Sequence, residues 1–507
     1  MPKTIKKVLV ANRGEIALRV MRALRELEIP SVAVYSEADR EAAHVLFANE
    51  AICVGPAAST ESYLRIDRIL AAVKSSGADA VHPGYGFLSE NPAFARALRD
   101  AGVVFIGPSP EAMEVMGNKL TARAAMIEAG VRVIPGSDGA LHDPEEAARL
   151  AGEIGFPVML KAAAGGGGKG MRVVREEGEL AQALEATQAE AAKAFADSAV
   201  FVEKYIDRPR HVEIQVLADR KGNTVYLGER ECSIQRRHQK VVEESPSPIV
   251  SEAMRREMGE MAVRVAKACE YEGAGTVEFM VDADRDFYFL EMNTRLQVEH
   301  PITELTYNVD LVKLQLAVAS GKALPFTQAD LQPRGWAMEF RIYAEDPATD
   351  FLPSTGKIHR LREPEGPGIR HDSGIYEKYD VPVFYDPLLS KLVVFGETRG
   401  EVIQRARRAF SEFVIAGIRT NLPFHQWLLR QSDFEKGDFD THFIDRHFKP
   451  ELLESDEDLP FVALAAATLA YHQHGRRMNF AGLQAFSRRP SRWKLAARRE
   501  AVTRRQN

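Results

Sequence analysis

The chain has 507 residues, of which 45% are hydrophobic and 27% are charged, and its formal net charge is −6. This composition is typical of a globular protein of roughly two to four domains, whose core needs no disulfide bonds. The acidic balance argues against nucleic acid as a partner, and no apolar run approaches the length of a membrane span. The N-terminal segment lacks the long apolar run of a signal peptide, and the cysteines, Cys53, Cys232 and Cys269, lie far apart. We therefore expect a cytoplasmic protein.

The first part of the chain alternates apolar runs with a helical pattern. The apolar runs, each the length of a buried strand, are residues 6–11, 31–36, 78–84 and 103–108. Between the first two runs, apolar residues recur at helical spacing over 15–27. The alternation predicts a doubly wound α/β domain over residues 1–115. Its first turn contains Gly14 alone, so the G-x-G-x-x-G pattern of a dinucleotide site is absent.

The rest of the chain divides into three parts. Residues 116–205 have mostly helical patterning, residues 211–300 alternate in the manner of antiparallel β-strands, and residues 331–447 are mixed. After Glu451 an acidic stretch resembles a linker, and a helix is predicted over 460–474, followed by a basic tail.

A run of glycines at 165–168 lies between Lys161 and Lys169. Consecutive glycines lose more conformational entropy on folding than other residues, so they do not suit a regular element. They suit a flexible flap whose backbone N–H groups approach phosphates. The segment is not a P-loop, because Gly170 follows Lys169 where that motif has Ser or Thr. A mobile surface linker is the alternative interpretation.

The segment 229–240 is rich in cationic side chains. These are Arg230, Arg236, Arg237, His238 and Lys240. Such a cluster favours a polyanion such as a triphosphate as its ligand. A basic surface loop is the alternative.

Polar and apolar residues alternate from Glu291 to Glu299. An extended strand would place these polar side chains on one face: Glu291, Asn293, Arg295, Gln297 and Glu299. A hairpin folded about Asp284 would bring Glu278 opposite position 290, next to Glu291. Neighbouring carboxylates repel each other, and Glu, Glu and Asn are oxygen ligands of the kind that Mg²⁺ takes together with phosphates. The pattern therefore predicts a magnesium site, with a solvated polar sheet face as the alternative.

Together with the segment HPGYGFLSEN at 82–91, these motifs resemble the biotin carboxylase subunit of acyl-CoA carboxylases, a member of the ATP-grasp superfamily. The resemblance runs from Lys7 to about Lys449 and also rests on ANRGEIA, FIGPS, GNK, VEKYI, RHVEIQV and EMNTRLQVEHPITE. The glycine run departs from the family pattern, which commonly has Ser and five glycines.

The resemblance implies a set of domains. These are an N-terminal α/β (pre-ATP-grasp) domain at 1–115, an ATP-grasp domain at 116–330 with a mobile lid at about 133–205, a mixed α+β C-terminal domain at 331–447, and an extension at 451–507.

The resemblance also implies roles for individual residues. The implied ATP-binding positions are Lys119, Lys161, Gly167, Gly168, Met171, Glu203, Lys204, Ile206, His211, Gln235, His238, Glu278 and Glu291. A pair of Mg²⁺ (or Mn²⁺) ions would be held by Glu278, Glu291 and Asn293. Bicarbonate would be held by Lys240, Arg295, Gln297 and the Val298 backbone.

The remaining implied roles concern catalysis. Glu299 would be the general base that accepts the bicarbonate proton. Arg341 would face the ureido oxygen of biotin, and Tyr85 would lie near the same ring. Arg295 and Lys240 would orient the anions.

The sequence contains no Met-Lys-Met, the family's biotin attachment sequence, so we expect biotin on a separate carrier protein. Carboxyltransferase subunits are the other expected partners, and residues 451–507 resemble the start of a docking region. We expect a homodimer or a larger hetero-oligomer. Three alternatives stay open: the biotin-carboxylating subunit of a two-subunit pyruvate carboxylase, another ATP-grasp carboxylate–amine ligase, and a subunit without catalytic activity.

Overall fold

The computed structural model describes residues 4–137, 139–141, 143–163, 170–195, 197–453 and 467–469. Residues 1–450 form one compact unit, and the chain from Glu451 onward forms a second. Most of the helix predicted at 460–474 lies outside the described residues, although residues 467–469 are helical.

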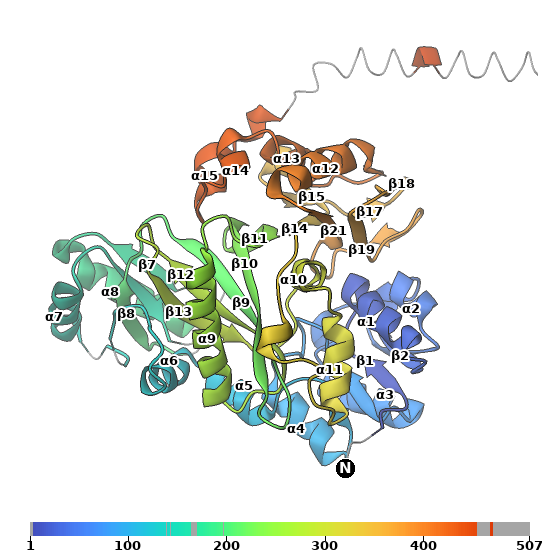
Figure 1. Ribbon diagram of the computed structural model, residues 1–507, viewed down its shortest axis with the longest axis horizontal. Coiled ribbons are helices and arrows are strands. Elements are labelled where there is room, and N and C mark those ends of the chain that lie inside the picture. Colours follow the sequence, from blue (N-terminus) through green and yellow to red (C-terminus); the bar gives the residue numbers. More distant parts are fainter. Residues whose placement is uncertain are drawn as a thin grey trace, which may run out of the picture. The chain divides into compact units, whose positions relative to one another are not determined.

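The N-terminal part, coloured blue in Figure 1, contains a five-stranded parallel sheet of order β3-β2-β1-β4-β5. Its strands are β1 (Val8–Val10), β2 (Ser31–Ser36), β3 (Glu50–Gly55), β4 (Ala80–His82) and β5 (Val104–Phe105). Its helices are α1 (Gly14–Glu26), α2 (Ala43–Phe47), α3 (Ile66–Ser76) and α4 (Pro92–Asp100). Val8 and Val10 pack on the side of α1, whereas Leu9 packs on the side of Phe94 in α4. Both faces are thus covered, and the predicted doubly wound fold is confirmed.

The centre of the molecule is an eight-stranded sheet of order β13-β12-β9-β10-β11-β14-β21-β19. Its strands are β9 (Arg210–Ala218), β10 (Thr224–Arg236), β11 (Gln239–Ser245), β12 (Gly273–Val281), β13 (Phe287–Asn293), β14 (Trp336–Tyr343), β19 (Ile369–Ser373) and β21 (Leu388–Gly396). This sheet runs without interruption from the segment expected to be the ATP-grasp domain into the C-terminal segment.

Helices cover the first half of this sheet on both sides. They are α9 (Glu252–Ala268), α10 (His300–Tyr307) and α11 (Leu311–Ala319). On β9, Val212, Ile214 and Val216 pack against the methionines of α9. The residues between them, His211, Glu213 and Gln215, point to the opposite face and are also buried.

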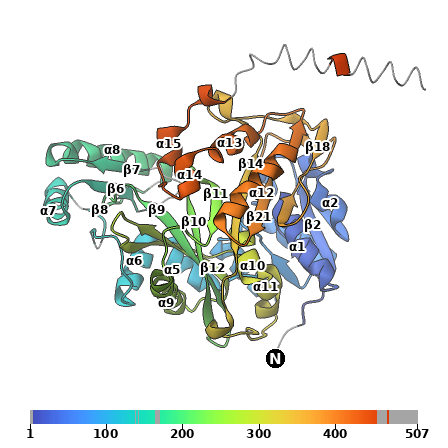
Figure 2. The same cartoon turned by 45° about the horizontal axis from the view of Figure 1, so that its top comes forward.

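A smaller three-stranded sheet consists of β7, β6 and β8 (Figure 2). It has a hydrophobic cluster of its own. Its elements are β6 (Val158–Ala162), β7 (Met171–Val174), β8 (Val200–Lys204), α7 (Pro144–Ile154) and α8 (Glu177–Phe195). The helices α5 (Pro110–Gly117) and α6 (Lys119–Glu128) connect the N-terminal sheet to this part.

The C-terminal segment is mixed α+β, as predicted. Its helices are α12 (Arg399–Glu412), α13 (Leu422–Leu428), α14 (Ser432–Lys436) and α15 (Phe443–His447). Its short strands are β15 (Glu345–Asp346), β16 (Leu352–Pro353), β17 (Gly356–Lys357), β18 (Arg360–Arg362), β20 (Asp380–Val381) and β22 (Val414–Ala416). Among the described helices of the chain, none combines the length and the apolar character needed to cross a membrane.

Candidate active site

A cavity of about 650 Å³ lies between the small sheet and the eight-stranded sheet. The predicted site residues that line it are Lys161, Met171, Glu203, Lys204, Ile206, His211, Gln235, His238, Lys240, Glu278, Glu291, Asn293, Arg295, Gln297, Val298 and Arg341. These residues come from segments almost 200 positions apart, so the fold brings together one site from separate motifs.

Some predicted positions do not line this cavity or cannot be described. Glu299 lies just behind the wall and is reached through Lys240 and Arg341. The Tyr85 hydroxyl is directed at Glu15 of α1 instead of the cavity. Lys119 is the first residue of α6, but its side chain lies outside the described atoms, as do Gly167 and Gly168.

The carboxylates of Glu278 and Glu291 belong to residues that face each other directly on β12 and β13. The expectation that Glu278 would lie opposite position 290 is wrong, because the register shifts between Glu278 and Phe279. Phe279 pairs with Phe289, so Leu290 is the extra residue of a β-bulge. Phe287 and Phe289 face the core, and simple alternation would send residue 291 there too. The bulge reverses the alternation and turns Glu291 and Asn293 toward the cavity.

The extended strand expected from 291 to 299 is only partly present. β13 ends at Asn293, and Glu299 is the residue that precedes α10. Arg295 and Gln297 lie in the intervening turn and nevertheless face the cavity. Within this turn, Arg295 donates to Gln297 Oε1 at 2.6 Å and to Asn293 Oδ1 at 2.9 Å.

The oxygen donors of this region fit a divalent cation. Glu278 is buried, and Asn293 Nδ2 lies 2.9 Å from its Oε1. Burial alone would raise the pKa of Glu278, but Lys240 and His211 hold that pKa well below its usual value, so the carboxylate stays ionised. An ionised carboxylate directly across from a second glutamate, with an amide beside them, is a donor set that Mg²⁺ accepts.

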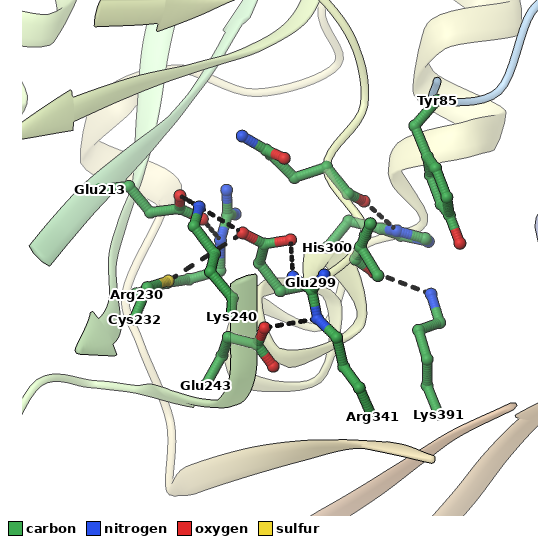
Figure 3. A network of polar contacts seen from close by, with 12 residues as sticks. Tyr85, Glu213, Arg230, Cys232, Lys240, Glu243, Glu299, His300, Arg341 and Lys391 are labelled. Atoms are coloured by element: carbon green, nitrogen blue, oxygen red, sulfur yellow. Dashed lines mark hydrogen bonds and ion pairs between the residues drawn. The ribbon is translucent and has the colours of Figure 1, made fainter. Parts of the chain in front are cut away.

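Lys240 is the centre of a buried charge cluster (Figure 3). Its Nζ lies 2.5 Å from Glu213 Oε2, 2.9 Å from Glu278 Oε1 and 2.7 Å from Glu299 Oε1. Burial would lower the pKa of the ammonium, but the surrounding carboxylates raise it well above the usual value. The ammonium therefore stays charged at the boundary between the Glu278–Glu291 pair and Glu299.

Glu299 lies between two cations. Its Oε1 accepts from Lys240, and its Oε2 accepts from Arg341 Nη2 at 2.9 Å. Burial would raise the pKa of Glu299, but Lys240 and Arg341 outweigh burial and hold it well below the usual range of a glutamate. On its other side, Arg341 Nε lies 2.6 Å from Glu243 Oε1.

The cationic segment 229–240 only partly faces the cavity. Arg230 is fully buried and contacts Glu213, and Arg236 pairs with Glu345 at 3.1 Å. Arg237 pairs with Asp350 on the surface at 2.7 Å. The three arginines therefore do not line the cavity, and Arg237 fits the alternative of a basic surface loop, whereas Gln235, His238 and Lys240 do line the cavity. Arg237 and His238 lie in the turn between β10 and β11, and Gln235 pairs with Lys240 across these two strands.

The other end of the cavity is built by the small sheet. Lys161 on β6 donates to Glu203 Oε2 on β8 at 2.6 Å, and Arg123 lies 3.3 Å from the other oxygen of Glu203. Met171 on β7 adds an apolar surface to the same wall. An ammonium and an apolar side chain in the same cavity suit the phosphates and the base of a nucleotide.

Glu213 and Glu243 belong to the charge cluster and had no predicted role, and Arg230, predicted to favour a polyanion, pairs with Glu213 inside it. The alternation of β9 contained a signal for Glu213, because its polar residues follow the pattern of a strand with one apolar face. No comparable signal existed for Glu243, whose neighbours become evident only when β11 pairs with β14.

Comparison with protein-family models identifies each part of the chain. Residues 4–113 match the biotin carboxylase N-terminal domain, and residues 339–446 match the biotin carboxylase C-terminal domain. Residues 118–327 match the ATP-binding domain of the carbamoyl-phosphate synthase L chain.

Individual relatives match over most of their length. Biotin carboxylase 1 of Bacillus subtilis is 53% identical over 87% of this chain and 99% of its own. A pyruvate carboxylase subunit of Methanothermobacter thermautotrophicus is 52% identical, with 93% of this chain and 99% of its own covered. The propionyl-CoA carboxylase alpha chain of Ruegeria pomeroyi is 48% identical over 94% of this chain and 73% of its own.

Solved structures agree with these matches. A biotin carboxylase complex with β-γ-ATP from Campylobacter jejuni superposes with a TM-score of 0.85 at 49% identity, covering 88% of this chain and 99% of that one. The biotin carboxylase domain of the Hydrogenobacter thermophilus 2-oxoglutarate carboxylase, solved as a dimer with MgADP, ADP and bicarbonate, superposes with a TM-score of 0.84 at 45% identity, covering 90% of this chain and 100% of that one.

The fold and the site together define an ATP-dependent ligase of the ATP-grasp class. The expectation that ATP and Mg²⁺ are its cofactors is also confirmed. More narrowly, the chain belongs to the biotin carboxylase family.

Proposed function

We propose that this chain carboxylates biotin held by a separate carrier protein, as the first half-reaction of an acetyl- or propionyl-CoA carboxylase. The observation that carries the proposal is the placement of Glu299. An ionised carboxylate lies between Lys240 and Arg341, next to a cavity that also contains the Glu278–Glu291 pair. A proton acceptor is thus close to a metal-triphosphate site and to a guanidinium.

At the nucleotide end, we assign Lys161 and His238 to the phosphates and Met171 to the adenine side. Glu278, Glu291 and Asn293 would hold Mg²⁺, which neutralises phosphate charge when bound. The main task of the protein side chains is then to position the γ-phosphate, because phosphoryl transfer depends on the alignment of the reacting groups and on charge neutralisation.

In the first step, a bicarbonate oxygen attacks the γ-phosphorus while the bond from that phosphorus to ADP breaks. Glu299 accepts the bicarbonate proton, and Arg295, Gln297 and the Val298 backbone hold the anion. Lys240 contacts both Glu278, on the metal side, and Glu299, the proton acceptor. The same ammonium therefore takes part in phosphate binding and in proton transfer. Movement of Lys240 toward the substrate anions would remove one cation from Glu299 and would make Glu299 a stronger base.

In the second step, carboxyphosphate separates into CO₂ and phosphate. The phosphate removes the N1′ proton of biotin, Arg341 stabilises the negative charge on the ureido oxygen, and N1′ attacks CO₂. The guanidinium of Arg341 is buried between Glu243 and Glu299, so its orientation is set before biotin enters. We also assign Tyr85 to the biotin side of Arg341, with its hydroxyl donating to Glu15.

The second candidate is the biotin-carboxylating subunit of a two-subunit pyruvate carboxylase. The observation that favours it is the 52% identity with the Methanothermobacter pyruvate carboxylase subunit over 93% of this chain. Both candidates require the same active site and differ only in the acceptor on the partner.

The partners follow from the same proposal. We assign a biotin carrier protein, carboxyltransferase subunits and a second copy of this chain, by analogy with the dimeric domain among the solved relatives. We place the reaction in the cytoplasm, and we assign residues 451–507 to contacts with the partners.

The test is to measure ATP hydrolysis and the transfer of labelled bicarbonate to free biotin. The wild-type chain should hydrolyse ATP only with bicarbonate and should label biotin. Glu299→Gln keeps the size of the side chain but removes the proton acceptor, so turnover should fall roughly 10²-fold or more while ATP still binds. Near-normal turnover of this variant, or hydrolysis that ignores bicarbonate, would reject the proposal and favour another carboxylate–amine ligase.

A further inference from the structure

We infer that Lys391 is a positioning residue, which orients the peptide between Val298 and Glu299 so that the base meets bicarbonate. The inference rests on the proposed function, because it assigns Lys391 to the turn that holds bicarbonate. Lys391 belongs to β21 in the C-terminal segment, far from that turn in sequence.

Lys391 is one of the largest fully buried side chains of the described structure. Its Nζ (Figure 3) donates to the backbone oxygen of Val298 at 2.7 Å. The same Nζ lies 3.2 Å from Glu15 Oε1. Burying an ammonium costs free energy, which hydrogen bonds and ion pairs must offset. One of the three N–H groups of this ammonium donates to a backbone carbonyl beside the cavity. This hydrogen bond indicates that the lysine positions the backbone at that carbonyl.

The orientation of the Val298 carbonyl affects the geometry of the site. Residues 294–298 belong neither to a strand nor to a helix, so regular secondary structure does not determine the orientation of this peptide. The same peptide unit carries the amide of Glu299, and Val298 lines the cavity. Rotation of the peptide would therefore move the bicarbonate contact and the base relative to each other.

A second buried contact supports this view of the turn. His300 Nδ1 lies 2.8 Å from the backbone oxygen of Gln297. Burial holds the pKa of His300 well below its usual value, so the ring is neutral, and Nδ1 must carry the proton to donate to this oxygen. Two consecutive carbonyls are thus held by buried donors, of which only Lys391 is charged and reaches in from another segment.

Lys391 also connects the turn to the N-terminal domain. Glu15 on α1 pairs with Lys391 and accepts from the Tyr85 hydroxyl. On β14, Arg341 lies directly across from Lys391. The ammonium of Lys391 therefore makes a structural ion pair with Glu15 and a hydrogen bond to Val298 beside the site. Mutation can separate the effects of these two contacts.

The experiment compares Lys391→Met, Glu15→Gln and the double variant with the wild-type full chain. Lys391→Met should raise the KM for bicarbonate roughly tenfold, because it removes a charge-assisted hydrogen bond, and should leave the KM for ATP within about twofold. Glu15→Gln keeps the Val298 contact and an acceptor for Tyr85, so its KM for bicarbonate should stay within about twofold of wild type.

The double variant separates stability from positioning. Lys391→Met alone leaves Glu15 as an uncompensated buried carboxylate, whereas Lys391→Met with Glu15→Gln removes both charges. We expect the melting temperature to recover in the double variant while the KM for bicarbonate stays about tenfold raised.

Other results would overturn the inference. An unchanged KM for bicarbonate in Lys391→Met would do so, as would recovery of this KM in the double variant or failure of both variants to fold, which would make the role of Lys391 purely structural. A wild-type chain without bicarbonate-dependent ATP hydrolysis would instead reject the proposed function, so the two failures are distinguishable.

Discussion

Glu243 on β11 and Glu339 on β14 lie directly opposite each other, and both are buried. Neither oxygen of Glu339 has a hydrogen-bond partner among the described residues. Burial raises the pKa of Glu339 well above the usual value, and burial also raises the pKa of Glu243 to about 7 although Arg341 opposes the shift. Adjacent carboxylates of this kind hold a proton at neutral pH because two charges would repel.

Glu243 should therefore make stability depend on pH in a defined window. Its pKa is about 7 in the folded chain and 4.5 without its surroundings, so the folded state binds a proton more tightly. The stabilisation it provides is complete below pH 4.5 and is lost as pH rises through about 7.

Glu243→Gln mimics the protonated carboxyl and should remove this dependence. Relative to wild type, the variant should gain stability between pH 5 and pH 8, by up to about 3 kcal/mol. Melting temperatures of both proteins across this range would measure the difference. A constant difference would show that Glu243 is ionised throughout.

The pair of Glu278 and Glu291 makes a separate prediction about metal. Glu291→Ala should raise the Mg²⁺ concentration needed for half-maximal turnover by roughly tenfold or more, because it removes an oxygen ligand. Asp284→Ala, in the exposed turn of the same hairpin, is the control and should leave the requirement unchanged. Equal Mg²⁺ requirements for wild type and Glu291→Ala would remove Glu291 from the metal site.

At the scale of elements, Arg230 joins strands β9, β10 and β12 to helix α10. Its guanidinium contacts Glu213 at 2.5 Å, Gln215 at 2.7 Å, and Thr276 and Thr303 at 2.9 Å. The pair with Glu213 is completely buried, with 0% exposure of either side chain. The guanidinium therefore contacts two residues of β9, one of β12 and one of α10.

Arg230→Met should lower the free energy of unfolding by about 3–5 kcal/mol, because it leaves Glu213 with one cation fewer inside the protein. Arg237→Met is the matched control, since its pair with Asp350 is exposed, at 69% and 73%. That variant should change stability by less than about 1 kcal/mol. Chemical denaturation would measure both, and similar losses in the two variants would contradict a special role for burial.

The strand pattern of this region was largely predictable, but the bulge was not. Alternation in β9 and β13 indicated which residues share a face. The position of Leu290 outside that alternation depends on Phe287 and Phe289 packing with Phe279 in the core. The sequence pattern does not show how these rings pack, so it could not predict that Glu278 pairs with Glu291.

At the scale of the molecule, the compact unit ends at Pro450, close to the end of the biotin carboxylase C-terminal match at residue 446. The described site residues all belong to this unit. We therefore expect the extension from Glu451 to be separable from the chemistry.

Deletion of residues 455–507 should leave bicarbonate-dependent ATP hydrolysis and free-biotin carboxylation near wild-type rates. The same deletion should weaken co-purification with the carrier and carboxyltransferase subunits. Pull-down of the truncated and full chains from the same expression host, with the native partners co-expressed, would measure the loss. Unchanged co-purification would reject a docking role for the extension.

The sequence by itself determined the family, the order of the domains and most residues of the cavity, because long motifs keep their residue types in order and because strand alternation sorts side chains by face. The tertiary structure alone decided which charges compensate one another. The partners of three buried cations, Lys240, Arg341 and Lys391, lie on strands and turns that are distant in sequence. The interaction energy of a buried charge depends on those neighbours and on the exclusion of water. For this reason the ionised state of Glu299, the proton near Glu243 and the contact of Lys391 with Val298 became evident only in three dimensions.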